Sequence, residues 1–363
     1  MSSLNLGLNL DFMSKQEPPV QYIQLTPEEE LQIVQDSNRL LEQIDNDCRL
    51  LDHMCSAYEN LIILKEHYEQ YGSSPALEVL VGDIKEYLGI SLEADESSDN
   101  TDTSDNTDDN KSGGLGGSIN KIWNWIVNLF KRIGEWIGIV DKKVDSDSAK
   151  IESKLKEIDL NKYYTVKHLK PLYQDNTLGK IPDCSSIEQS FKSALSNSSF
   201  GGGESSAIDS LSKAVEALKP YTELAETELK GTDIKTLYKN TRTLWKSIYR
   251  INKNVGPGLK QIQENMNSGE KPKNDAERKN FDGLVNALKK AINYIKLTMH
   301  RAAVSIAAIS KTLYGKDNQS GRTDADIAKE KQEKNKLIEQ GRQEQKQQED
   351  KEKEQANSNN NKS

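Results

Sequence analysis

The chain has 363 residues, of which 34% are hydrophobic and 29% are charged, and its formal net charge is −8. This length allows two or three domains, and a mean hydropathy of −0.77 indicates that polar linkers join the segments able to pack. The sequence has no window of about 18 uncharged apolar residues, which excludes a membrane-spanning helix.

Residues 1–25 are interpreted as an irregular arm. Leu4, Leu6, Leu8 and Leu10 alternate with polar or small residues, a weak strand-like pattern that docks as an edge or stays loose. The arm has neither a cationic start nor a continuous apolar stretch, so we expect no secretory signal.

An acidic helical hairpin is predicted over residues 26–92. Thr26 and Pro27 suit the cap and the first position of a helix, and the three glutamates that follow suit its positive end. Apolar residues then recur every three or four positions to about residue 71, and a second patterned helix ends at Gly89. The apolar stripes of the two helices are expected to cover each other, and the hairpin is a candidate propeptide.

A disordered linker is predicted over residues 93–117. Residues 93–112 hold eight carboxylates and one lysine, so burial cannot offset the entropy of ordering the chain. The aspartate spacing loosely resembles a calcium loop, but the fixed glycine and the terminal glutamate of such a loop are missing. A linker is therefore the favoured interpretation, and four glycines at its end add a joint.

Three of the four tryptophans lie in an amphipathic helix predicted over residues 119–140. Its polar side carries three cations and one anion. Such a helix packs in a bundle or lies in a lipid interface, and packing on a bundle or a partner is the favoured of the two. The apolar face consists of Ile119, Ile122, Trp123, Ile126, Phe130, Ile133, Trp136 and Ile137.

Residues 118–314 are predicted to form a helical body, and the chain as a whole is expected to be all-α. Residues 315–363 are a charged tail, interpreted as a fraying helix or a disordered segment. After residue 140, helical stretches are expected at 141–176, 186–195, 205–230, 232–253, 257–268 and 275–314.

Charge is divided unevenly along the chain. Residues 1–112 carry 24 acidic and 6 basic side chains, giving −18, whereas residues 113–314 carry 22 acidic and 32 basic ones, giving +10. A basic stripe recurs at helical steps in the second half and could hold nucleic-acid phosphates without reading bases. An ordinary solvated helix face is the simpler interpretation. The candidate DNA contacts are Lys239, Arg242, Lys246, Arg250 and Lys253.

Motifs that carry chemistry are missing from the sequence. It has no HExxH, GxSxG, phosphate-loop or dinucleotide motif, and its four histidines lack ligand-spaced partners. We therefore expect no enzyme, no cofactor and no metal site, and no residue is a catalytic candidate. Cys48 and Cys55 share a helix face and, like Cys184, are interpreted as buried small hydrophobes.

The order of these parts resembles that of the internal head proteins of large tailed bacteriophages, which are structural proteins packed inside the capsid. The resemblance covers residues 40–160 and rests on the acidic hairpin, the polar tether and a few short strings. These strings are YLGI followed by SLEA at 87–94, INKIWNWI at 119–126 and RIGEWI at 132–137.

The resemblance implies a non-enzymatic virion component of the capsid interior, made in the host cytoplasm and trimmed by the phage maturation protease. Such proteases resemble enzymes that cut after a glutamate, so the candidate cleavage site is Ser91, Leu92, Glu93 and Ala94. Two further matches, at 76–78 and 186–188, lie in predicted helices. The implied partners are the maturation protease, capsid or scaffold proteins and, without sequence specificity, DNA.

Charge suggests what trimming would achieve. Residues 1–93 carry 17 acidic and 5 basic side chains, so their removal raises the net charge by 12, from −8 to +4. We expect the acidic hairpin to keep the precursor off DNA during assembly and its loss to leave a cationic body. The alternatives are a membrane-associated protein that places residues 119–140 on a membrane surface, and an intracellular adaptor that binds partners through helical faces.

Overall fold

The computed structural model describes residues 25–340, with gaps at 73, 88–114, 197–204, 269–271, 273, 315–322, 324, 327 and 337. The described residues are mostly helical, with two small antiparallel sheets, which confirms the predicted all-α class. The helices are α1 (Pro27–Tyr71), α2 (Pro75–Tyr87), α3 (Leu115–Lys154), α4 (Cys184–Ser196), α5 (Ser205–Glu216), α6 (Gly231–Asn267) and α7 (Asp275–Tyr314).

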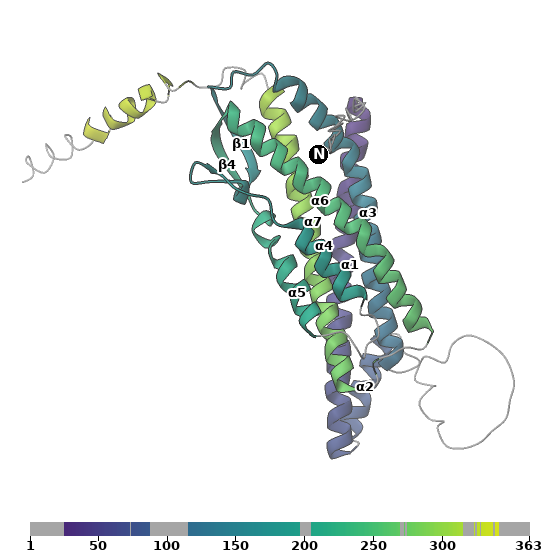
Figure 1. Cartoon of the computed structure of the whole chain (residues 1–363). Coiled ribbons are helices and arrows are strands. Elements are labelled where there is room, and N and C mark those ends of the chain that lie inside the picture. The colour runs from purple at the N-terminus through teal and green to yellow at the C-terminus, as the bar shows by residue number, and fades with distance from the viewer. Residues whose placement is uncertain are drawn as a thin grey trace, which may run out of the picture.

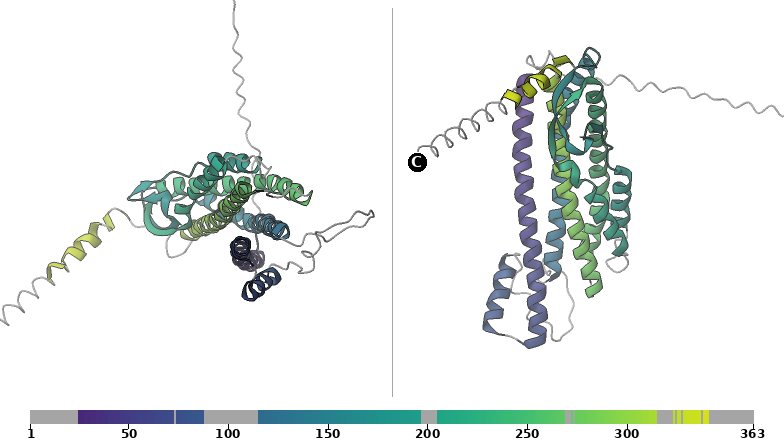
Figure 2. Two further views of the ribbon diagram at one scale, coloured as in Figure 1. Left: turned by 90° about the horizontal axis from the view of Figure 1, so that it is seen from below. Right: turned by 90° about the vertical axis from the view of Figure 1, so that its left-hand side faces the viewer.

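Four long helices, α1, α3, α6 and α7, run side by side along the length of the molecule (Figure 1). The central helix α3 packs against α1, α6 and α7. The shorter α4 and α5 pack against each other and against α6 and α7, and α2 folds back along the far end of α1 (Figure 2). Helix α1 therefore lies at one side of the bundle, with α3 between it and α6.

Helix α1 begins and ends as its sequence predicts. The Thr26 hydroxyl accepts a hydrogen bond from the Glu29 backbone N–H at 3.2 Å, and the Glu29 carboxylate accepts one from the Thr26 N–H at 2.8 Å. This reciprocal capping box satisfies two N–H groups that the first helical turn leaves free. At the other end Gly72 has a φ of 82°, which a glycine adopts without steric cost.

The predicted hairpin of α1 and α2 is present, but most of the α1 apolar stripe does not face α2. Leu61 packs with Met54, Ala57, Val81 and Ile84 in a small cluster between the two helices. The rest of the stripe joins the main core, because the 13 residues of α2 cannot cover a helix of 45 residues. The buried α1 residues of the main core are Ile44, Leu51, Cys55 and Tyr58.

The predicted helices at 141–176 and 205–230 are wrong in their second parts, which form strands. Strand β1 (Tyr163–Leu169) pairs antiparallel with β4 (Leu224–Lys230). In β1 Tyr164, Val166 and His168 are buried in alternation with exposed residues, a period of two that favours a strand over a helix. Short 3-10 turns at Lys170–Leu172 and Lys219–Thr222 flank these strands.

A second, smaller hairpin follows β1. Strands β2 (Tyr173–Gln174) and β3 (Thr177–Leu178) pair across a two-residue turn. Asp175 and Asn176 both have positive φ, at 53° and 60°, as a tight hairpin turn requires, and these residue types tolerate that conformation best after glycine.

Helix α6 is continuous where the sequence predicts two helices, at 232–253 and 257–268. Pro257 lies inside it. Val255 before the proline and Leu259 after it are both buried. Their packing keeps the helix continuous although Pro257 cannot donate a backbone hydrogen bond. Within the predicted tail, described positions between 325 and 340 are helical.

Candidate functional site

The apolar face of α3 is the centre of the core. All eight residues predicted for this face are at most 3% exposed. Two of its indoles are hydrogen-bonded to neighbouring helices: Trp123 Nε1 donates to the Leu259 carbonyl of α6 at 3.1 Å, and Trp136 Nε1 donates to the Ser37 hydroxyl of α1 at 2.9 Å. The favoured prediction of bundle packing is confirmed.

The burial of this face bears on the membrane alternative. Contact between α3 and lipid would require the bundle to open, because α1, α6 and α7 all cover this helix. Among the described residues, no helix combines the length and the apolarity needed to cross a bilayer.

The acidic side of α1 meets a basic face of the body. Glu30 binds two lysines of α3, with Oε1 2.5 Å from Lys150 Nζ and Oε2 3.9 Å from Lys143 Nζ. Further along α1, Asp47 pairs with Arg132 of α3. As the residue numbers rise along α1 they fall along α3, so these pairs fix an antiparallel alignment of the two helices.

Helix α7 contributes the other half of this basic face. Asp52 Oδ1 lies 2.6 Å from Lys289 Nζ, and Asp45 pairs with Lys296. The Lys296 side chain is only 8% exposed, and the Asp45 carboxylate is the acid that compensates this buried cation. We call the five cations that meet α1 the masked basic face: Arg132, Lys143, Lys150, Lys289 and Lys296.

Electrostatics and burial act together at this contact. A hydrogen bond from Lys150 lowers the pKa of Glu30, so its stabilising effect is present above its ordinary pKa and is lost as the pH falls through the lowered value. Between the charges, Ile44 is fully buried and Leu51 is 2% exposed. The described parts of the predicted units 26–92 and 118–314 are therefore packed together in one bundle.

The five predicted DNA contacts on α6 do not form one exposed surface. The Arg242 side chain is 15% exposed and pairs with Asp145 and Asp141 of α3. Arg250 Nε lies 3.1 Å from Glu188 of α4. The remaining lysines, Lys239, Lys246 and Lys253, are exposed. The stripe is interrupted at Arg242, which faces two acids of α3, whereas Arg250 is itself exposed and is paired with Glu188 of α4.

The candidate cleavage residues Ser91, Leu92, Glu93 and Ala94 lie outside the described residues. The two other three-letter matches fall within α2 and α4, as expected. The proposed cleavage site stays a prediction.

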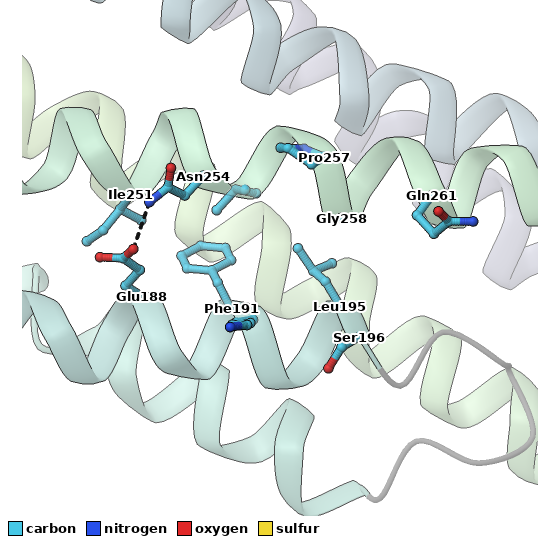
Figure 3. Close-up of a pocket in the computed structure, with 11 residues that line it drawn as sticks. Glu188, Phe191, Leu195, Ser196, Ile251, Asn254, Pro257, Gly258 and Gln261 are labelled. Carbon is cyan, nitrogen blue, oxygen red and sulfur yellow. Dashed lines mark hydrogen bonds between the residues drawn. The ribbon is translucent and has the colours of Figure 1, made fainter.

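A groove between α4 and α6 was not predicted from the sequence (Figure 3). Its volume is about 580 Å³ and its lining is mostly apolar. At its rim the Asn254 side chain donates to Glu188 at 2.7 Å. Gly258 marks a close approach of the two helices, because a Cβ there would lie 3.0 Å from Leu195 Cβ. The apolar lining residues are Phe191, Leu195, Ile251, Val255 and Pro257.

The side chains of His168 and of the cysteines are hydrogen-bonded or at least partly buried within the fold. The His168 ring bonds the Leu169 carbonyl at 2.9 Å and the Thr227 hydroxyl at 3.1 Å within the β1–β4 sheet. All three cysteines are free, and burial raises the pKa of the Cys55 thiol to about 11. Across the described ranges, no group of three or more histidine, cysteine or carboxylate side chains is placed to hold a metal ion.

Asp282 of α7 gives the α1 contact a pH dependence. It lines a small cavity with Tyr58 and Glu59 of α1. Burial, and then the Glu59 charge, raise the pKa of Asp282 from 3.8 to about 6, while Arg278 opposes the rise. The stability tied to this raised pKa is fully present below pH 3.8 and is lost as the pH rises through about 6.

The variant Asp282→Asn is expected to melt at a higher temperature than the parent chain at pH 7, because it removes a buried charge beside a like charge. At pH 4.5 the two should melt at closer temperatures, since Asp282 is then largely protonated in the folded chain. Thermal unfolding followed by circular dichroism checks this. Glu59→Gln should reduce the effect of pH, and an equal difference at both pH values would contradict the assignment.

No protein-family model, curated protein or solved structure matches this chain.

Proposed function

We propose that the protein is a non-enzymatic structural component of the interior of a bacteriophage head, in which acidic α1 covers the basic face of a helical body. The observation that carries this proposal is the pairing of four α1 carboxylates with the five cations of the masked basic face. The division of charge along the chain, −18 from 24 acids and 6 bases before residue 113 and +10 from 22 acids and 32 bases in 113–314, supports it.

The physical reason for such a cover is the behaviour of cations toward DNA. A cluster of unpaired lysines and arginines binds phosphates without sequence preference and releases counterions. While α1 is docked, these cations are matched by carboxylates within the same molecule, so the precursor is kept off nucleic acid during assembly. Phosphates of DNA packed into a capsid would then compete with the α1 carboxylates for the same cations.

The packing of α1 on the body affects how the proposed trimming would work. Because α1 is held by buried apolar contacts as well as by charge, a cut in residues 88–114 would not by itself remove it. We therefore propose two steps, cleavage of the connection followed by displacement of α1, in place of simple loss of a separate domain. The maturation protease, capsid or scaffold proteins and DNA are the proposed partners.

DNA binding by the full-length chain tests the masking. The triple variant Asp45→Asn, Asp47→Asn, Asp52→Asn frees Lys296, Arg132 and Lys289. It should bind duplex DNA of arbitrary sequence on the order of 10-fold more tightly than the parent chain at low salt, and the gain should shrink as salt rises. Gel-shift titration measures both.

A control with the same change in charge separates masking from net charge. Glu28→Gln, Glu42→Gln and Glu66→Gln remove three exposed carboxylates of α1 that are outside the ion pairs described above. This control should bind DNA less tightly than the first variant. Equal affinities of the two variants for DNA would show that net charge alone governs binding, and would contradict the masking proposal.

The virion part of the proposal has its own test, which is mass spectrometry of purified particles of the phage that encodes the chain. Peptides from the body should be present, and those from residues 1–93 should be depleted relative to them. Absence of the chain from the particles would reject the location. Equal abundance of peptides from both regions would reject trimming.

A further inference from the structure

The contact between α1 and the body combines ion pairs with a row of buried apolar side chains. It is formed by side chains along one side of the bundle, and α2 packs on α1. We propose that the masked basic face also accepts α1 from a second copy of this chain, so that two copies associate by exchanging their N-terminal helices. This inference concerns self-association and does not rest on the proposed function.

The contacts that would align an exchanged α1 are those that align α1 within one chain. The ion pairs of Glu30, Asp47 and Asp52 set the alignment, and the hydrogen bond between Trp136 and Ser37 adds a directional contact. Ile44, which is fully buried, supplies the apolar centre. Each of these contacts would form equally well with the α1 of another copy, because none depends on which chain carries it.

The covalent connection is long enough to allow exchange. Between Tyr87 at the end of α2 and Leu115 at the start of α3 lie residues 88–114. These 27 residues can span up to about 90 Å when extended. The 45 residues of α1 are about 68 Å long at 1.5 Å per residue. The connection can thus reach a second body lying beside the first.

Concentration decides which arrangement is populated. The contact has nearly the same energy whether α1 docks on its own body or on that of a second copy. The single chain is therefore favoured over the exchanged pair only by the effective concentration of its own α1. For two parts joined by a short linker that concentration is on the order of 1 mM. We therefore expect single chains at micromolar concentration and exchanged pairs as the concentration approaches ~1 mM.

Chemical crosslinking between two differently marked copies tests the exchange. In a background with Cys48, Cys55 and Cys184 replaced by alanine, one copy carries Asp47→Cys and the other carries Arg132→Cys. The two are unfolded together, refolded at ~5 μM or ~1 mM, and treated with a short bismaleimide. The first concentration lies far below the effective one and the second is close to it. A covalent pair of the two chains should form at the higher concentration only.

Controls make each outcome decisive. A chain carrying both cysteines should crosslink within itself at either concentration. If it does so while the mixed sample yields no covalent pair at the higher concentration, the proposal is overturned. Leu50 is 44% exposed, so Leu50→Cys in place of Asp47→Cys should give little product. A pair that persists when Ile44→Asp is added would reflect random collision and would also overturn it.

Light scattering of the unmodified chain is an independent measurement. The average mass should rise from that of one chain, 40.8 kDa, toward twice that value as refolding is carried out at higher concentration. A constant mass of one chain at every concentration would reject the exchange whatever the crosslinking shows. DNA is absent from both experiments, so their failure would leave the masking proposal untouched.

Discussion

Replacing Trp123 with alanine is expected to lower the free energy of unfolding by about 3–5 kcal/mol. The indole is fully buried and lies 6.3 Å from the Phe281 ring, centroid to centroid. Its loss leaves a cavity between α3, α6 and α7, and it also removes the hydrogen bond to the Leu259 carbonyl. Denaturant unfolding followed by circular dichroism at 222 nm measures the change.

A neighbouring tryptophan is the matched control for this prediction. Trp125 lies two residues along the same helix but is only partly buried. Trp125→Ala should therefore lower the free energy of unfolding by less than half as much as Trp123→Ala. The reason is that the Trp125 indole buries less apolar surface on folding. Equal costs for the two substitutions would mean that α3 is not oriented in the bundle as described.

The second large effect concerns cleavage between α2 and α3. If a site for a specific protease is placed within residues 93–112 and cut, the fragment containing α1 is expected to remain bound to the body. Ile44, Leu51 and Tyr58 are at most 2% exposed in the contact, and at about 25 cal/mol per Å² their burial resists separation even without the covalent link. Co-elution of both fragments from a size-exclusion column is the expected result.

Two substitutions on the same helix sharpen this test. Ile44→Asp places a charge in the apolar centre of the contact and should release the fragment after cleavage. Leu50→Asp places the same charge at a position that is 44% exposed, and the fragment should stay bound. If the parent fragment separates on cutting, α1 is a removable unit after all, and displacement by DNA would be unnecessary.

The long helices could be predicted from the sequence because their signals are local. The Thr26 cap, the three- and four-residue apolar steps and the final Tyr314 before Gly315 set the ends of α1 and α7 within a residue or two. The buried face of α3 was predicted residue by residue for the same reason. Each of these features depends on the order of neighbouring residues and on helical geometry alone.

The errors arose where distant residues decide the structure. Strand β1 exists because it pairs with β4, more than fifty residues away, and the adjacent residues Tyr163–Tyr164 and His168–Leu169 obscure the period of two. Helix α6 continues through Pro257 because buried residues on both sides hold it. In both cases tertiary packing overrode a local signal.

The docking of α1 could not be derived from the sequence for a different reason. An apolar stripe shows that a helix packs but not what it packs against, so the hairpin with α2 and the contact with α3 were equally consistent with it. The charge division was a partial signal, because an acidic segment beside a basic one favours contact. Arg242 illustrates the limit, since nothing local shows that it faces Asp145 and not solvent.

The two hydrogen-bonded indoles of α3 give the molecule a built-in optical reporter for separate movements. Trp136 contacts Ser37 of α1, whereas Trp123 contacts Leu259 of α6. Emission from an indole shifts to longer wavelength when water reaches it, so a chain in which Trp123 or Trp136 is the sole tryptophan would reveal which neighbouring helix has departed. Departure of α1 could then be followed in real time, without a label, while the remaining helices stay together.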